Sequence, residues 1–182
     1  DAFITNSSTA AAQLNTEKRI KRQPIFFVPN AVLEDFEPRE TARQRLAREL
    51  SLNPDVLWLV SIGRLEQLKH FDEPLKIAAA MRENQTPFQV ILIGGGPEES
   101  NLTELTHQLK LEELVRLPGE IPNANRMLKG FDIFCMPSTS EGLPNVVMEA
   151  AAAGLPIVTW KLPFYEELLT PGKTALMAAP GN

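Results

Sequence analysis

Five short, almost uninterrupted apolar runs follow residue 55, and they constrain the fold more than any other feature of the chain. Runs without polar alternation are typical of strands buried on both faces. Helical patterns lie between them. The alternation predicts an α/β fold, a doubly wound parallel sheet with right-handed crossovers. The expected strands are VLWLVSIG (Val56 to Gly63), FQVILIGGG (Phe88 to Gly96), LVRLPG (Leu114 to Gly119), FDIFCMPS (Phe131 to Ser138) and LPIVTW (Leu155 to Trp160); the expected helices are about Phe71 to Arg82, Glu98 to Lys110, Asn123 to Lys129 and Pro144 to Ala153.

The first fifty residues contain one more β-α-β unit. AFITNS indicates a strand, Ser7 or Ser8 indicates the cap of a helix over TAAAQLNTEKRIK, and IFFVPNAV (Ile25 to Val32) indicates a second strand. A polar connection containing proline then leads to a helix near Thr41 to Leu50. We expect residues 1–37 and 38–182 to be separate parts, although residues 1–37 also fit the edge of the same sheet.

Composition excludes several classes of protein. The net charge is −5, and the basic residues cluster only in EKRIKR (Glu17 to Arg22), so a nucleic-acid partner is not expected. The single cysteine, Cys135, lies in an apolar run and is expected to be a buried structural thiol in a reducing compartment. No apolar stretch reaches the roughly 20 residues of a membrane-spanning helix. The chain starts at Asp1 rather than Met, so we expect a piece of a longer protein.

Charged residues and glycines follow four of the predicted strands. In an open parallel sheet these positions gather at one edge, where ligands bind. Arg64 and Lys69 follow the first buried strand, and a fork-shaped and a point-like cation suit a diphosphate; the alternative is two solvated surface cations. The glycines from Gly94 to Gly96 allow either close approach to a ligand or a tight turn, and they do not form the dinucleotide fingerprint.

Two carboxylates, Glu141 and Glu149, stand in the almost uncharged segment PSTSEGLPNVVMEAAAAGLP. Pro144 fits the first turn of a helix that stops at Gly154, which places Glu141 just before the helix and Glu149 inside it. The free N–H groups of residues 145–147 would then face an anion between the carboxylates. The alternative is an ordinary surface helix with a charged face.

These segments together resemble the C-terminal donor-binding domain of the retaining glycosyltransferases of family 4, which have the GT-B fold with Rossmann-like domains. The resemblance covers roughly Asp55 to Trp160 and rests on SIGRLEQLKHFD, ILIGGGPEE, VRLPGEIPN and FDIFCMPSTSEGLPNVVMEAAAAGLPIV. AFITNSSTAAAQL and FFVPNAV resemble the last unit of the N-terminal domain and its linker. The resemblance implies that residues 38–182 bind a nucleotide-diphosphate sugar. It also implies that the rest of the N-terminal domain and the C-terminal crossover helix lie outside the chain.

The resemblance implies a role for each matched residue. Arg64 and Lys69 would bind the donor diphosphate, Glu141 would face the transferred sugar, and Glu149 would hold the ribose hydroxyls. With Glu141, the two cations would be catalytic. The remaining donor-binding residues would line the nucleobase, sugar and phosphates: Gly63, Gly94, Gly119, Glu120, Ile121, Gly142, Leu143, Pro144, Asn145 and Val146. No metal is expected, because the chain has no D-x-D motif and the cations can meet the charge of the leaving nucleotide.

The implied reaction is transfer of a hexose-type sugar, in polysaccharide or lipopolysaccharide biosynthesis, to a glycan or lipid-linked acceptor bound by the missing domain. A UDP-sugar is the expected donor substrate, with GDP- and ADP-sugars as alternatives, and no cofactor is expected. The expected location is the cytoplasm, or the inner face of the membrane through the missing half. The fragment alone should be inactive. The alternatives are a non-catalytic interaction domain of the same fold and a sugar-nucleotide epimerase.

Two positions depart from the family pattern. His70 stands where the family usually has a small residue, and the segment from Trp160 to Pro163 replaces a glycine-rich turn. Both departures bear on the shape of the site around the donor sugar and the acceptor.

Overall fold

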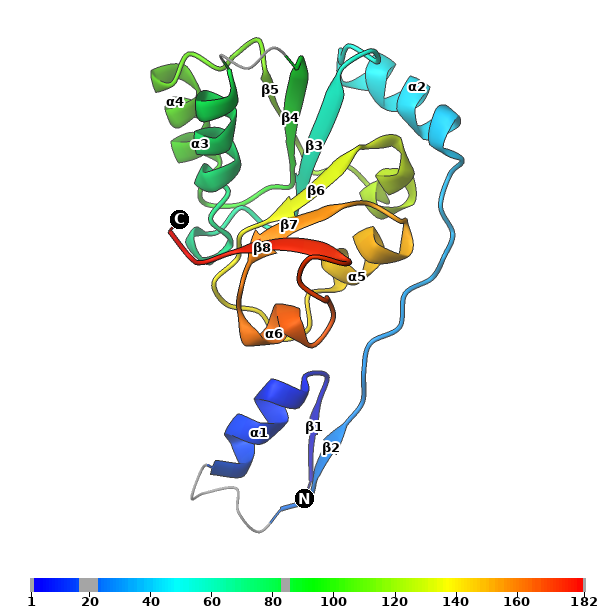
Figure 1. The fold of residues 1–182 in the computed structure, drawn as a ribbon, viewed down its shortest axis with the longest axis vertical. Coiled ribbons are helices and arrows are strands. Elements are labelled where there is room, and N and C mark those ends of the chain that lie inside the picture. The colour runs from blue at the N-terminus through cyan, green and yellow to red at the C-terminus, as the bar shows by residue number, and fades with distance from the viewer. Residues whose placement is uncertain (1, 17–22, 83–85, 182) are drawn as a thin grey trace.

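The main body of the protein is a six-stranded parallel sheet. A computed structural model describes residues 2–16, 23–82 and 86–181 (Figure 1). The strand order is β5-β4-β3-β6-β7-β8, and every neighbouring pair is parallel. The strands are β3 (Leu57–Ile62), β4 (Phe88–Ile93), β5 (Val115–Gly119), β6 (Ile133–Met136), β7 (Ile157–Trp160) and β8 (Ala175–Ala178). The predicted doubly wound α/β fold is therefore confirmed.

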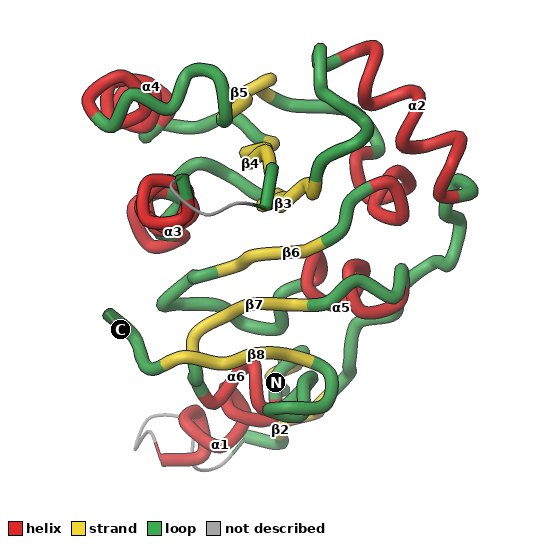
Figure 2. Tube along the Cα trace, turned by 45° about the horizontal axis from the view of Figure 1, so that its top comes forward, coloured by secondary structure: helices red, strands yellow, loops and turns green. Residues whose placement is uncertain are grey.

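Helices cover both faces of this sheet. Figure 2 shows α3 and α4 on one side of the strands and α2 and α5 on the other. The helices are α2 (Arg39–Glu49), α3 (Asp72–Met81), α4 (Glu99–Gln108), α5 (Asn145–Ala152) and the short α6 (Pro163–Glu166), with 3-10 turns η1 (Gln67–Lys69) and η2 (Ala124–Gly130). The segment predicted as a helix from Asn123 to Lys129 is thus a 3-10 helix.

Strand β4 shows why the apolar runs have no polar alternation. All six of its residues are buried. Ile91 and Ile93 belong to the core that includes α2, η2 and α5, whereas Val90 and Leu92 belong to the core that includes α3 and α4. Successive side chains point to opposite faces of a strand, so a strand covered on both faces is almost entirely apolar. The polar residue of β4, Gln89, accepts a hydrogen bond from the N–H of Asn53 at 2.8 Å.

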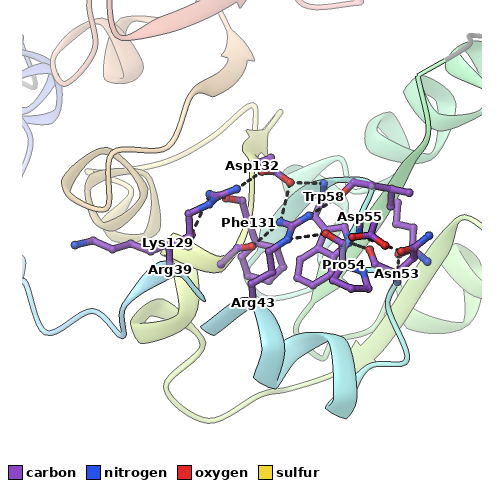
Figure 3. Close-up of polar contacts among 12 residues, drawn as sticks. Arg39, Arg43, Asn53, Pro54, Asp55, Trp58, Lys129, Phe131 and Asp132 are labelled. Atoms are coloured by element: carbon purple, nitrogen blue, oxygen red, sulfur yellow. Dashed lines mark hydrogen bonds and ion pairs between the residues drawn. The ribbon is translucent and has the colours of Figure 1, made fainter. Parts of the chain in front are cut away.

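An ion-pair cluster, in which Arg43 and Asp132 are largely buried, fastens α2 to the amino-terminal end of the sheet (Figure 3). Arg39 and Arg43 both pair with the carboxylate of Asp132, which also accepts a hydrogen bond from the N–H of Trp58 at 2.8 Å. The Arg43 guanidinium lies 4.0 Å from the centre of the Trp58 ring. This cluster holds three segments together: α2, the start of β3 and the turn before β6.

The N-terminal β-α-β unit forms a sheet of its own. Strand β1 (Phe3–Thr5) pairs in parallel with β2 (Ile25–Phe27), and α1 (Ser8–Thr16) connects them. Figure 1 shows this unit beyond α6, joined to α2 by an extended segment. The unit is therefore not the edge of the main sheet, which corrects one of the two arrangements that the sequence left open. Glu17 to Arg22, including the end of the predicted helix, lies outside the described residues.

Direct contacts join this unit to the main body. The carboxylate of Glu167 accepts hydrogen bonds from the N–H groups of Ser8 and Thr9, at 3.0 and 2.7 Å, and from the Ser7 hydroxyl at 3.1 Å. Ser7 itself accepts from the N–H of Ala10, as expected of a helix cap. The Glu167 carboxylate, about 160 residues away in the sequence, thus provides hydrogen-bond acceptors for N–H groups at the start of α1 that have no partner within the helix.

Candidate functional site

The strand order reverses between β3 and β6. From β3 the chain moves outward through β4 to β5, and it then returns to build β6, β7 and β8 on the other side. The crevice at the carboxyl ends of β3 and β6 is the place where doubly wound sheets bind ligands. The connections that leave these strands hold Lys69 and Glu141, so the structure places both residues at the reversal.

Lys69 and Glu141 form an ion pair across this crevice. The Lys69 Nζ donates to Glu141 Oε1 at 2.5 Å, and the side chains are only 21% and 11% exposed. The two connections are also joined through their backbones, because Thr139 N–H and the Ser138 hydroxyl donate to the carbonyl of Leu68 at 2.9 and 3.1 Å. A fixed cation beside a fixed carboxylate is suited to meet a ligand that carries both phosphate and hydroxyl groups.

Arg64 lies on the same edge but is arranged differently. Its side chain is 71% exposed, and its Nε pairs with Glu66 Oε1 at 2.6 Å. It borders a cavity of about 300 Å³ between the ends of β3, β4 and β5. The lining of that cavity contains Gly63, Gly94, Glu120 and Ile121 of the predicted site, and also Ile62, Ile93, Gly95 and Ala124.

The glycine run after β4 has a packing role. A Cβ on Gly94 would lie 1.9 Å from the carbonyl oxygen of Gly63, and one on Gly96 would lie 2.4 Å from that of Leu65. Leu65 N–H donates to Gly95 O, and Gly94 N–H donates to Gly119 O. The sequence suggested either close approach to a ligand or a tight turn, and the structure adds a third role, close backbone packing between the loop after β3 and the loop after β4.

Glu149 lies on α5 and is half-buried. Its Oε1 accepts a hydrogen bond from Asn125 Nδ2 at 3.2 Å. Burial raises the pKa of the Glu149 carboxyl, and the bond from Asn125 offsets part of that rise. The sequence analysis did not predict Asn125, on η2, as a residue of the site, because nothing in its local pattern marks it. Asn125 reaches the site only through its hydrogen bond to Glu149, which is 24 positions away.

The loop from Gly142 to Val146 begins α5. Pro144 is its N-cap rather than a residue of its first turn. Val147 N–H donates to the carbonyl of Pro144 at 3.1 Å, so this N–H is not free to face an anion as the sequence suggested. The Asn145 side chain accepts from Asn30, and Gly142 lies against the side chain of Asn6. The N-terminal unit and its connection therefore contact this loop directly.

His70 and Trp160, the two departures from the family pattern, contact each other. Their ring centres are 4.9 Å apart. The sequence analysis did not predict this contact. The only indication of it was that both residues depart from the family pattern in the same chain. Cys135 is buried, as predicted, and burial raises its pKa to about 12, which suits an inert thiol.

The structure offers no evident metal centre at this edge. Within residues 2–16, 23–82 and 86–181, no three His, Cys, Asp or Glu side chains are grouped to hold a metal ion. In the same ranges, no helix has the length and apolar character needed to cross a membrane.

This arrangement defines a doubly wound α/β domain with charged groups at its topological switch point. The family model described as glycosyl transferases group 1 matches residues 42–182. The chain belongs to this glycosyltransferase family, and its fold is the Rossmann-like fold of GT-B glycosyltransferases.

Three similar proteins illustrate the relationship. An uncharacterized glycosyltransferase of Haemophilus influenzae is 35% identical over 102 residues, which are 56% of this chain and 29% of that protein. The D-inositol 3-phosphate glycosyltransferase of Kribbella flavida is 28% identical and covers 100% of this chain and 45% of its own length. The crystal structure of Anabaena HepE in complex with UDP-glucose has a TM-score of 0.82, 20% identity, and coverage of 99% of this chain and 50% of that one. The chain thus spans about half or less of these proteins.

Proposed function

We propose that residues 38–182 are the donor-binding domain of a retaining glycosyltransferase of family 4. The domain would bind a nucleotide-diphosphate sugar, with UDP as the expected nucleotide, for transfer of a hexose to a glycan or lipid-linked acceptor. The observation that carries the proposal is the ion pair of Lys69 and Glu141 at the switch point. UDP-glucose bound to the similar Anabaena structure supports the choice of donor.

Each charged residue has a proposed role. Lys69 and the exposed fork of Arg64 bind the diphosphate and stabilise the charge on the departing nucleotide. Glu141 faces the transferred sugar. Glu149, whose Oε1 already accepts a hydrogen bond from Asn125, accepts hydrogen bonds from the ribose hydroxyls.

The cavity beside Arg64 is proposed to hold the nucleobase. Its lining joins apolar side chains, Ile62, Ile93 and Ile121, to the backbone of Gly94 and Gly95. Flat rings bind well between apolar side chains and backbone polar groups. Gly119 and Glu120 would border the base, and Gly142, Leu143, Pro144, Asn145 and Val146 would border the sugar and phosphates.

The two sheets support a division of the protein. We propose that residues 1–37 are the last unit and linker of the N-terminal, acceptor-binding domain, because β1 and β2 pair with each other in a sheet of their own. The transfer would take place in the cytoplasm or at the inner membrane face, and it would need that domain in full. The chain by itself would bind donor without completing the transfer.

Calorimetric titration of the chain with UDP, GDP, ADP and their sugars tests donor binding. We expect Lys69→Ala and Arg64→Ala each to weaken UDP binding by about tenfold or more, because each removes a charged partner of phosphate. Lys76→Ala is the matched control, since Lys76 forms a comparable ion pair with Asp72 on the exposed face of α3. Equal binding by all four proteins, or no binding by the native chain, would contradict the proposal.

Turnover by the full-length protein tests the reaction itself. Transfer that is lost in Glu141→Ala would exclude a non-catalytic interaction domain. Consumption of the donor without any acceptor would indicate a sugar-nucleotide epimerase instead. The anomeric configuration of the product, read by NMR, decides whether the enzyme retains or inverts.

A further inference from the structure

The rings of His70 and Trp160 meet above the carboxyl ends of the strands. His70 comes directly after η1, and Trp160 is the last residue of β7. The ring planes are inclined by 58°, with the centres 4.9 Å apart, a geometry that is favourable for aromatic side chains. Trp160 is 8% exposed, so its indole is a fixed surface for the imidazole.

The backbone of His70 is held in an unusual conformation. Its φ is 50° and its ψ is 46°, in the left-handed region that glycine occupies most easily. A residue with a Cβ is retained there at a conformational cost. The contacts of the ring therefore stabilise this conformation, and they fix the direction in which the chain leaves Lys69.

The imidazole is also tied to the connection that carries Glu141. His70 Nε2 lies 3.1 Å from Thr139 Oγ1. Thr139 Oγ1 also lies 3.2 Å from the carbonyl oxygen of Leu68, and the imidazole tautomer sets which of His70 and Thr139 donates in their own hydrogen bond. Asp72 is the charged group facing the other ring nitrogen, with its Oδ1 3.9 Å from Nδ1.

These contacts involve the residues that flank Lys69 in the chain. Leu68 and His70 stand on either side of Lys69, and both bond to Thr139, two residues before Glu141. The residues on either side of the cation are thus fixed to the segment that carries the carboxylate.

We propose that His70 is a positioning residue for the donor site: its imidazole, held between the Trp160 ring and the Thr139 hydroxyl, aligns Lys69 with Glu141 before the donor arrives. The proposal rests on the proposed function for the identity of the ligand only. Trp160 is the support on which the imidazole is held.

The coupling energy between Lys69 and Glu141 tests the alignment without any ligand. It is obtained from a double-mutant cycle of Lys69→Met and Glu141→Gln, followed by urea unfolding, in the native chain and in the His70→Gly background. Glycine suits the left-handed conformation, so this variant is expected to fold. The coupling is expressed as a ratio of the unfolding equilibrium constants of the four proteins in the cycle. We expect this ratio to be at least threefold smaller in the His70→Gly background than in the native chain. An unchanged ratio overturns the proposal.

Two further variants separate alignment from general stability. Ser51→Gly is the matched control, because Ser51 also has a left-handed backbone, with φ 53°, and is exposed at the opposite end of β3. It should leave the coupling unchanged. Trp160→Leu should reduce the coupling as His70→Gly does, and Trp160→Phe, which keeps an aromatic face, should restore most of it. Equal coupling in the Leu and Phe variants contradicts the role of Trp160 as the support.

Donor affinity gives the functional readout. We expect His70→Gly to bind UDP and UDP-glucose about fivefold to tenfold more weakly than the native chain, and Ser51→Gly to bind as the native chain does. If the native chain binds the donor and the His70→Gly variant binds it equally well, the inference is overturned and the proposed function is unaffected. A native chain that binds no nucleotide sugar contradicts the proposed function, and the coupling measurement then still decides the role of His70.

Discussion

The carboxylate of Glu149 is held where it costs the unliganded chain some stability. Its pKa is raised by burial, against the opposing effect of the bond from Asn125. When the pKa of a carboxyl is higher in the folded than in the unfolded protein, the group stabilises the fold fully at a pH below the unfolded-state pKa. This stabilisation is lost as the pH rises through the folded-state pKa. At neutral pH the ionised group is therefore mildly unfavourable, which is typical of a residue retained for binding.

Glu149→Gln should consequently change stability and binding in opposite directions. We expect the free energy of unfolding at pH 7 to rise slightly, because the amide has no charge to desolvate, and UDP affinity to fall by about tenfold or more with the loss of a charged acceptor. Urea unfolding and calorimetric titration measure the two effects. Glu104→Gln, on the exposed face of α4, is the control. A variant that is less stable and binds UDP normally would show that Glu149 is structural.

At the scale of elements, two arginines of α2, Arg39 and Arg43, share one carboxylate, that of Asp132. Burial raises the pKa of the Asp132 carboxyl, but the Trp58 N–H and the guanidinium groups of Arg39 and Arg43 favour its charged form. Their effect is the larger, so the pKa of Asp132 is lowered overall. Arg43 is only 13% exposed and shares Asp132 with Arg39 of the same helix and with Trp58 of β3 (Figure 3). Loss of this carboxylate leaves a guanidinium largely buried without its charged partner.

Asp132→Asn should therefore lower the free energy of unfolding by about 1–3 kcal/mol at pH 7. The stabilisation by Asp132 is present above its unfolded pKa of about 3.8, and it is lost as the pH falls through the lowered folded value. The difference between the native chain and the variant should shrink in strong acid. Urea unfolding at pH 7 and pH 3 measures it, with the exposed Asp55→Asn as control. A difference independent of pH would argue against this assignment.

Two short elements near the C-terminus, α6 and β8, could not be predicted from the local sequence pattern. The sequence predicts the core of every strand from β3 to β7, but it does not predict β8 or α6. The sequence of β8 is ALMA, whose residues favour helices, and it becomes a strand because β7 offers it four paired positions. Helix α6 has only four residues, too few for a helical period to be visible.

For the whole molecule, the principal polar link between the N-terminal unit and the main body is Glu167. Burial opposes its ionisation, but hydrogen bonds from Thr9, Ser8 and Ser7 outweigh burial and lower its pKa. The link contributes stability above the usual glutamate pKa of about 4.5, and it weakens as the pH falls through the lowered folded value. The N-terminus of α1 is thus joined to the main body by a charged side chain.

Glu167→Ala should release the start of α1. We expect the amides of Ser8 and Thr9 to exchange with solvent about fivefold faster at pH 7, as expected for the loss of a helix cap, while β3 and β4 remain protected. Hydrogen exchange followed by NMR measures this. Glu166→Ala, the neighbouring exposed carboxylate, is the control. Equal protection in the native chain and both variants would mean that α1 is held by packing alone.

The sequence by itself determined the sheet and the edge that carries the candidate site. Apolar runs such as Phe88 to Ile93 suit only strands covered on both faces, and charged residues placed after such strands gather at one edge. Only the tertiary structure decided the partners. Arg64 pairs with Glu66, Lys69 with Glu141 72 positions away, and His70 with Trp160. Local periodicity carries no information about the pairs of Lys69 with Glu141 and of His70 with Trp160, because these depend on which strands become neighbours when the order reverses at β3 and β6.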